Sequence, residues 1–178
     1  MSEMADRSES VVAQGGELFA EQAEAERRQL LLFEACGEFF ALPLELVREV
    51  QPLERIIRVP NAPAEVLGIL NLRGRAHTVF DLGACLSLPA DPRPATHLVV
   101  LDLGEADLRI GLVAQTIGQV QSVAASEIGP PPQGEAGEGG LSGVFELKGQ
   151  VVGVLDLWRA MARFFAEWGV KATGRGAS

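Results

Sequence analysis

The stretch Gly68-Ile-Leu-Asn-Leu-Arg-Gly-Arg-Ala-His-Thr-Val-Phe-Asp-Leu82 decides the fold, because a related copy begins 75 residues later as Gly143-Val-Phe-Glu-Leu-Lys-Gly-Gln-Val-Val-Gly-Val-Leu-Asp-Leu157. Six of the fifteen aligned positions are identical, where average residue usage predicts about one. Each copy has two apolar runs on either side of a tight turn, which is Arg73-Gly74 in the first copy and Lys148-Gly149 in the second. This pattern is typical of a β-hairpin. The sequence therefore predicts the same hairpin twice.

The repetition extends to the rest of the chain. Residues 97–103 correspond to 29–35, and residues 110–113 and 116–120 correspond to 40–43 and 46–50 at an offset of 70. Each repeat supplies about five short strands, which are too few to cover both faces of an open sheet. We therefore expect an all-β fold with short helices, built of two small five-stranded β-barrels. The seam between the barrels should be apolar, and a groove there is a natural binding place.

Composition changes mark the boundaries of these units. Residues 1–28 are polar or weakly helical and should form a tail, and the Pro-rich stretch 83–95 should connect the repeats. Residues 44–50 fit a helix-like turn or a bent strand equally well, and residues 56–59 should form a short strand. Apolar residues at three-and-four spacing predict a C-terminal helix over about 156–169, with Asp156 as N-cap and Gly169 as its end. The expected units are a domain over 29–170, with subdomains over about 29–90 and 95–155, and a second tail over 171–178.

The net charge of −9 argues against several classes of partner. An acidic protein repels phosphate backbones and anionic lipid heads, so we expect neither nucleic acid nor a membrane surface as partner. The two cysteines, Cys36 and Cys85, lie far apart in the sequence and outside any metal-binding motif, which predicts reduced thiols and no metal. No apolar run has the length of a signal peptide or a membrane span, so we expect a cytoplasmic protein.

The sequence contains few residues that could carry out catalysis. The two histidines, His77 and His97, fall in predicted strands with no acid at ligand spacing. Asp81 and Asp156 occupy matching places of the repeat, which favours a shared capping role. The glycines at 134–143 lack the ending and context of a phosphate-binding loop. The sequence predicts no catalytic residue, no metal site and no cofactor.

The turn Asn71-Leu72-Arg73-Gly74 allows two interpretations. An arginine at a turn is often only a solvated charge. On a rigid hairpin, its planar guanidinium can also make a bidentate contact to a carboxylate of a partner, with Leu72 and Val47 as apolar neighbours. Composition leaves both interpretations open.

A series of short motifs in this chain resembles the CheW family of bacterial chemotaxis coupling proteins. The motifs are Phe39-Phe-Ala-Leu-Pro, Val47-Arg-Glu-Val, Pro60-Asn-Ala-Pro, Gly68-Ile-Leu-Asn-Leu-Arg-Gly74, Val79-Phe-Asp-Leu82, Ile110-Gly-Leu-Val, Ile128-Gly-Pro-Pro and Val154-Leu-Asp-Leu157. The resemblance covers about residues 29–166. It implies two SH3-like five-stranded β-barrel subdomains plus a C-terminal helix.

The resemblance also implies a function. CheW proteins are non-catalytic adaptors that join the regulatory domain of the histidine kinase CheA to the cytoplasmic tips of chemoreceptors, the methyl-accepting chemotaxis proteins, in membrane-associated arrays. This implies a cytoplasmic scaffold that is recruited to such arrays, has no cofactor and does not insert into the membrane.

The resemblance assigns binding roles by matching motifs. Residues implied to bind kinase or receptor are Val47, Glu49, Gly68, Asn71, Arg73 and Gly74. Residues implied to line the inter-subdomain groove for the receptor tip are Leu98, Ile117 and Val120. The chain departs from the family pattern at Thr78, Gly83 and Ala114-Gln115. An alternative is therefore a CheW-like scaffold of a non-flagellar chemosensory pathway, such as pilus motility or surface sensing.

Three rival functions can be weighed against the adaptor. A fragment of a CheA-type kinase would share the fold, but the chain holds no ATP-binding module. A small β-barrel hydrolase would have to use His77 or His97. An OB-like nucleic-acid binder conflicts with the acidic charge and the scarcity of aromatic residues for stacking bases.

Overall fold

The computed structural model describes residues 27–104, 108–131 and 138–167 of the chain. Its strands are β1 (Arg27–Ala35), β2 (Glu38–Pro43), β3 (Val47–Pro52), β4 (Val66–Leu72), β5 (Arg75–Phe80), β6 (His97–Leu101), β7 (Ile110–Ala114), β8 (Thr116–Ala124), β9 (Leu141–Leu147) and β10 (Gln150–Leu155). The short helices are η1 (Leu44–Leu46), α2 (Leu82–Cys85), η2 (Ala125–Glu127), η3 (Glu138–Gly140), α3 (Leu157–Ala160) and α4 (Ala162–Glu167).

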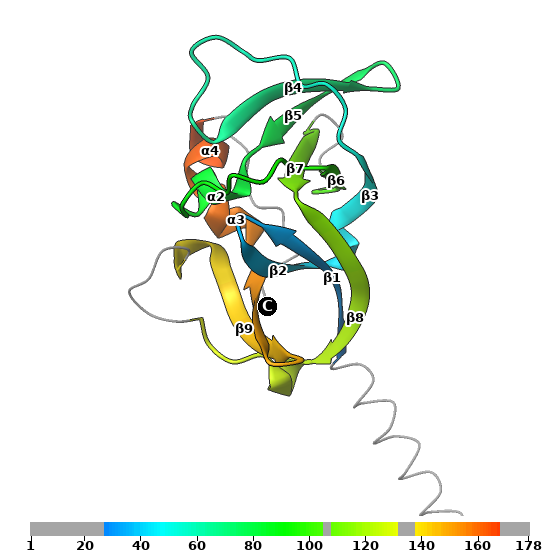
Figure 1. The fold of residues 1–178 in the computed structure, drawn as a ribbon, viewed down its shortest axis with the longest axis vertical. Coiled ribbons are helices and arrows are strands. Elements are labelled where there is room, and N and C mark those ends of the chain that lie inside the picture. Colours follow the sequence, from blue (N-terminus) through cyan, green and yellow to red (C-terminus); the bar gives the residue numbers. More distant parts are fainter. Residues whose placement is uncertain (1–26, 105–107, 132–137, 168–178) are drawn as a thin grey trace, which may run out of the picture.

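The strands form two five-stranded sheets that lie one above the other (Figure 1). Sheet A has the order β8-β1-β2-β10-β9, and sheet B has the order β3-β6-β7-β5-β4. The repeat relates the two orders, because β1 and β2 correspond to β6 and β7, β8 to β3, and the β9–β10 hairpin to β4–β5. Within each sheet one neighbouring pair is parallel, β2 with β10 and β5 with β7. The predicted mostly-β fold with two five-stranded units is confirmed.

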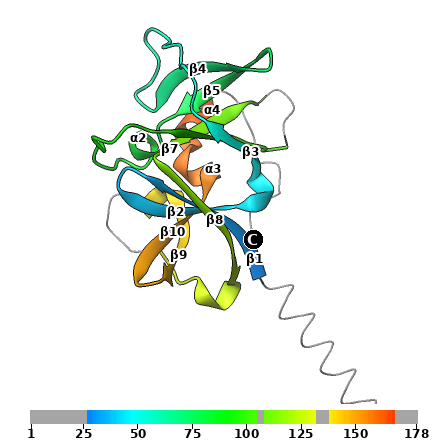
Figure 2. The ribbon, with the colours of Figure 1, turned by 45° about the vertical axis from the view of Figure 1, so that its right-hand side comes forward.

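The chain crosses from one sheet to the other inside each repeat. After β2 it passes through η1 into β3 of sheet B, and after β7 it passes through Gln115 into β8 of sheet A (Figure 2). Each sheet therefore takes two strands from one repeat and three from the other. The predicted subdomains over 29–90 and 95–155 do not coincide with the sheets. The physical reason lies at Pro43, which ends β2 because it has no N–H for the ladder, and the 3-10 turn that follows redirects the chain.

Three apolar clusters hold the sheets together. Leu30 and Phe145 belong to the cluster enclosed by sheet A, and Leu70 and Val79 to the cluster enclosed by sheet B. The third and largest cluster includes residues of both sheets, among them Phe33, Leu42, Phe80, Val99 and Leu112. Neighbouring residues of β1 point into different clusters, which explains the unbroken apolar run at residues 30–33.

The two predicted hairpins have the same turn. Arg73 and Gly74 have φ values of 51° and 80°, and Lys148 and Gly149 have φ values of 52° and 79°. Two consecutive residues with positive φ are typical of the type I′ turn, whose twist matches that of the flanking strands. The prediction of a tight turn at each of these places is confirmed.

The two equivalent aspartates begin short helices. The Asp81 carboxylate accepts hydrogen bonds from the backbone N–H of Gly83 at 2.9 Å and of Ala84 at 3.4 Å. The Asp156 carboxylate accepts one from the backbone N–H of Arg159 at 3.1 Å. Each therefore acts as an N-cap, as the repeat predicted.

The C-terminal helix is broken in two, whereas one continuous helix was expected. α3 ends at Ala160, and its C-cap residue Met161, which is almost fully buried in the shared cluster, separates it from α4. The break lets Met161, Phe164 and Phe165 all reach the core. The predicted end at Gly169 lies outside the described residues, as do most of the predicted N-terminal tail and the tail over 171–178.

Three loop predictions also need revision. Residues 44–50 contain both of the alternatives, since η1 leads directly into β3. The strand expected over 56–59 is reduced to a single bridge between Ile57 and Ile69, because the prolines that follow offer no further donors. The connector over 83–95 begins inside α2, which the Asp81 cap stabilises.

The end of the connector is tied to sheet A by ionic contacts. The Arg93 guanidinium lies 2.6 Å from the Glu34 carboxylate at the end of β1 and 2.6 Å from the Asp91 carboxylate. Gln115 lies beside this group and accepts a hydrogen bond from the Cys36 backbone N–H at 3.1 Å. The route from β5 to β6 is therefore fixed where it passes the β1–β2 turn.

Candidate functional site: the Glu49–Arg73 surface

The structure brings Glu49 and Arg73 together at the surface of sheet B. Their side chains form an ion pair with 3.1 Å between Arg73 Nη2 and Glu49 Oε2. Glu49 lies on β3 and Arg73 in the β4–β5 turn, and β3 and β4 are the two edge strands of the sheet. The Arg73 side chain is 82% exposed, so this pair contributes little to folding. Its guanidinium remains accessible to a partner.

The other residues predicted for this surface differ in accessibility. Asn71 and Gly74 are exposed, and Val47 is half-buried against the shared cluster. Gly68 is buried, has a φ of 146°, and lies so close to the Ile57 backbone that a Cβ would clash with it. Gly68 therefore shapes the surface without offering a side chain. Leu72, expected as an apolar neighbour of Arg73, faces the core of sheet B instead.

The three residues predicted for an inter-subdomain groove do not form one surface. Leu98 is fully buried in sheet B, where its side chain packs over Gly111. It is not available to a receptor in this structure, because β6 is a central strand covered on both faces. Ile117 is half-buried and Val120 is 44% exposed, and both lie on the edge strand β8 of sheet A.

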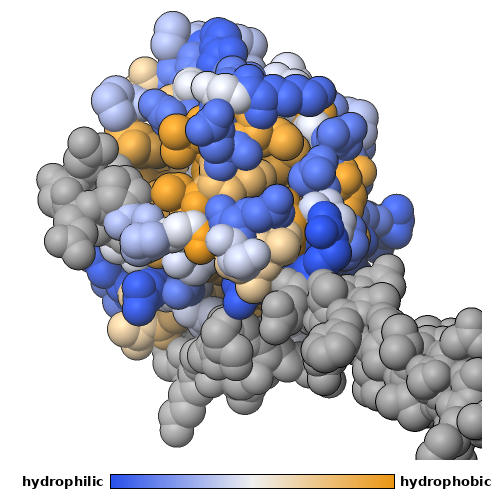
Figure 3. Space-filling model, turned by 90° about the horizontal axis from the view of Figure 1, so that it is seen from below, coloured by the Kyte–Doolittle hydropathy of each residue, from blue (hydrophilic) through white to orange (hydrophobic). Residues whose placement is uncertain are grey.

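Exposed apolar side chains occur on sheet A as well. Val151 is 67% exposed and Phe39 37% exposed. Figure 3 shows apolar side chains at the centre of the face seen from below, with polar ones around them.

The two histidines are engaged with their own strands. His77 is buried, with Nδ1 at 3.1 Å from the Arg75 carbonyl oxygen. His97 Nδ1 lies 2.7 Å from the Thr96 hydroxyl. Within the described ranges, no group of three or more His, Cys, Asp or Glu residues is placed to hold a metal ion.

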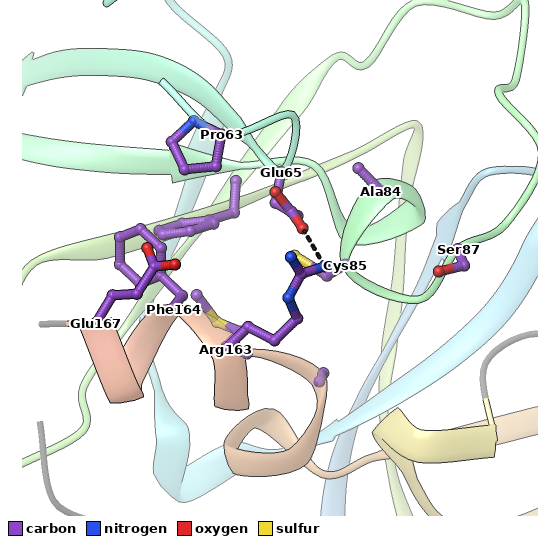
Figure 4. Close-up of a pocket in the computed structure, with 11 residues that line it drawn as sticks. Pro63, Glu65, Ala84, Cys85, Ser87, Arg163, Phe164 and Glu167 are labelled. Atoms are coloured by element: carbon purple, nitrogen blue, oxygen red, sulfur yellow. Dashed lines mark ion pairs between the residues drawn. The ribbon is translucent and has the colours of Figure 1, made fainter. Parts of the chain in front are cut away.

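A pocket of about 140 Å³ lies between α2, the loop before β4 and α4 (Figure 4). Arg163 and Glu65 form an ion pair across it, with 3.7 Å between Nη1 and Oε1. Burial raises the pKa of the Cys85 thiol to about 12, with Glu65 and Asp81 adding to the effect. This thiol stays protonated at neutral pH and is therefore a poor nucleophile. No sequence motif indicated this pocket, because its walls meet only in the folded chain.

Cys36 is the second free thiol and also lies next to Asp81. Burial and the Asp81 carboxylate raise the pKa of Cys36. Its Sγ is 3.9 Å from Asp81 Oδ1.

Across the part of the chain that the structure describes, no helix is long and apolar enough to cross a bilayer.

Comparisons with known proteins show the family of this chain. The model of the CheW-like domain matches residues 29–164. The chemotaxis protein CheW of Rhizobium meliloti (strain 1021) is 25% identical over 132 residues, which is 73% of this chain and 84% of the relative. The probable chemotaxis protein CheW of Rhizobium etli is 31% identical over 110 residues, which is 60% of this chain and 68% of the relative.

A solved structure has the same fold. The crystal structure of the scaffolding protein TtCheW from Thermoanaerobacter tengcongensis matches with a TM-score of 0.66 and 20% sequence identity, over 73% of this chain and 84% of that one. The family model alone spans well over half of the sequence. The chain therefore belongs to the CheW-like family.

Proposed function

We propose that this protein is a non-catalytic adaptor that couples chemoreceptors to the regulatory domain of a CheA-type histidine kinase. Membership of the CheW-like family supports the proposal, as do relatives named as chemotaxis proteins. The adaptor works in the cytoplasm at membrane-associated receptor arrays and needs no cofactor. It raises the effective concentration of kinase and receptor by binding both at once.

The observation that carries the proposal is the geometry of Glu49 and Arg73. Arg73 lies in a two-residue turn in which both residues have positive φ angles. Among the described residues, its side chain has a polar contact with Glu49 Oε2 alone, and most of its surface is exposed. A partner carboxylate can therefore take a bidentate contact with the guanidinium, while Glu49 remains to receive a donor from the same partner.

The remaining residues of the proposed binding surface surround this pair. Val47 lies two residues before Glu49 on β3, and Asn71 and Gly74 flank Arg73 on the hairpin. Gly68 allows the loop around Ile57 to pack against β4, so its role is to shape the hairpin. For the receptor tip, we propose contacts with Ile117 and Val120 on β8.

The test is a binding titration of three proteins against the cognate kinase regulatory domain and a receptor-tip fragment. Arg73→Ala should weaken the complex that uses this surface by ~2 kcal/mol or more, which is roughly thirtyfold in Kd. Arg73→Lys should rescue poorly, because an ammonium lacks the planar fork. Both variants should keep the unfolding midpoint of the wild type.

Lys148→Ala provides the matched control, since Lys148 occupies the equivalent turn of sheet A with nearly the same φ. It should bind the kinase domain as the wild type does. Equal affinities of wild type, Arg73→Ala and Arg73→Lys for both partners would leave Arg73 as a solvated charge and refute the proposed surface.

A further inference from the structure

The equivalent surface of sheet A has lost its internal ion pair. The repeat places Lys148 where sheet B has Arg73, and Gln119 where sheet B has Glu49. An amide cannot neutralise an ammonium, and Lys148 makes no ion pair within the described ranges. At this second surface the carboxylate partner of the turn cation is therefore missing from the sheet itself.

An apolar hollow of about 210 Å³ lies beside Lys148. Its wall includes Leu32, Phe39, Leu147 and Val152. Gly118 also lines it, and an ideal Cβ there would lie only 3.1 Å from Leu32 Cβ, so β8 and β1 approach closely at this position. The hollow opens between β8 and the tip of the β9–β10 hairpin.

The corresponding positions of sheet B carry different chemistry. Arg48 corresponds to Gly118, and Arg109 corresponds to Phe39, both at an offset of 70. The two related surfaces have therefore diverged, one towards charge and one towards a mostly apolar hollow that is lined by one cation, Lys148, and by Glu34, whose carboxylate is already paired with Arg93. An occupant of the hollow must bring an apolar side chain together with a carboxylate.

We propose that this hollow binds the chain's own residues 17–21, Glu-Leu-Phe-Ala-Glu, with the Phe19 ring in the hollow and a glutamate on Lys148 Nζ. The segment supplies the required pair of groups, since Phe19 is flanked by Glu17 and Glu21. Residues 1–26 carry seven carboxylates and one arginine, so the whole segment is attracted to an unpaired cation.

The length of the tether fits this occupant narrowly. Phe19 precedes Arg27, the first residue of β1, by eight residues, which span at most about 26–29 Å when extended. The hollow lies near the Glu34 end of β1, seven residues from Arg27, or about 23 Å along the strand. Phe19 can therefore reach the hollow only if the segment runs back nearly extended. Tethering makes this binding intramolecular, with a lower effective concentration for a nearly extended tether than for a relaxed one.

The experiment compares methyl NMR spectra of the full chain and three variants. In the wild type, the ring of Phe19 should shift the methyl resonances of Leu32, Leu147 and Val152. Phe19→Ser should abolish these shifts, and so should a deletion of residues 22–25, because the remaining four-residue span reaches only about 13–14 Å. Val12→Ser, which changes an apolar residue of the same tail, should leave them unchanged. Identical methyl spectra for the wild type, Phe19→Ser and the deletion would overturn the proposal.

A peptide of residues 14–24, added in trans, gives an independent readout. It should bind the Phe19→Ser chain at least tenfold more tightly than the wild type, whose hollow is already occupied. Lys148→Glu in the Phe19→Ser background should weaken the peptide at least tenfold, whereas Lys148→Arg should retain it. Equal binding of the peptide to the wild type and to Phe19→Ser would show that the segment does not occupy the hollow in cis and would refute the assignment.

Discussion

Cys36 and Gly83 meet where the β1–β2 turn of sheet A touches α2, the helix that follows β5 of sheet B. An ideal Cβ at Gly83 would clash with Cys36 Sγ, and the Gly83 N–H donates to the Asp81 carboxylate. The family that the chain resembles often has an arginine where this chain has Gly83, and the structure has no room for a side chain there. At Thr78, where a proline is usual in the family that the chain resembles, the N–H donates to the Arg109 carbonyl at 2.9 Å. The departures at residues 78 and 83 thus both have local physical reasons.

Gly83→Ala should destabilise the protein by about 1–3 kcal/mol, because the added methyl group overpacks the contact with Cys36. Cys36→Ala should remove most of this penalty, since it removes the sulfur that the methyl group would meet. Urea unfolding of the two single variants and the double variant gives the coupling energy. Additive effects of the two substitutions would contradict the direct contact.

The raised pKa of the Cys85 thiol predicts how the free energy of unfolding depends on pH. Its pKa is raised from 9.0 to about 12 in the folded state, so the folded chain holds this proton where the unfolded chain loses it. The contribution to stability is complete below pH 9 and is lost between about pH 9 and 12. Cys85→Ala should reduce the fall of the unfolding free energy over this range. An unchanged slope would show that other groups cause the fall.

At the scale of elements, local chemistry dominates where sequence and structure agree. The turn at Lys148-Gly149 and the caps at Asp81 and Asp156 depend on neighbours within four residues, so short motifs suffice to predict them. The strand expected over 56–59 and the unbroken C-terminal helix failed because loop packing and the burial of Met161 decide them. For the candidate site too, features set by local sequence were predictable and features set by tertiary packing were not. The Arg73 turn was visible in the sequence, whereas the burial of Leu98 depends on a sheet assembled from both repeats.

Gly149→Val should lower stability by about 1–3 kcal/mol, because a β-branched residue is strained at a φ of 79°. Gly139→Ala is the matched control, since an added Cβ there has no neighbour within 4 Å and its φ is not in the positive range. The urea midpoint should fall for the first variant and stay within error for the second. A midpoint unchanged by Gly149→Val would contradict the turn.

At the scale of the whole molecule, the two sheets form one folding unit, because each sheet contains strands from both repeats. The shared cluster is the largest of the three and contains residues of β1, β2, β6 and β7. Neither sheet can be completed by one repeat alone, although each repeat contains the same five strand patterns. Sequence periodicity predicts which segments are strands but says little about which repeat supplies their neighbours.

Leu112→Ala should destabilise both sheets together by about 2–5 kcal/mol, because Leu112 is fully buried in the shared cluster. Native-state hydrogen exchange measures the free energy of opening separately for each sheet. For the slowest-exchanging amides of β2 and of β7, this free energy should fall by the same amount. Loss of protection confined to sheet B would show that the sheets unfold separately.

Because each sheet contains strands from both repeats, the strands of one sheet leave the ribosome at different times. β2 pairs with β10, more than 100 residues later in the sequence, and a ribosome adding ~5–20 residues per second needs roughly 5–20 s to cover that distance. Over this interval the hairpin of β1 and β2, apolar on both faces, has emerged while the strands that complete its sheet have not. The nascent chain must therefore be protected from aggregation until its last strands appear.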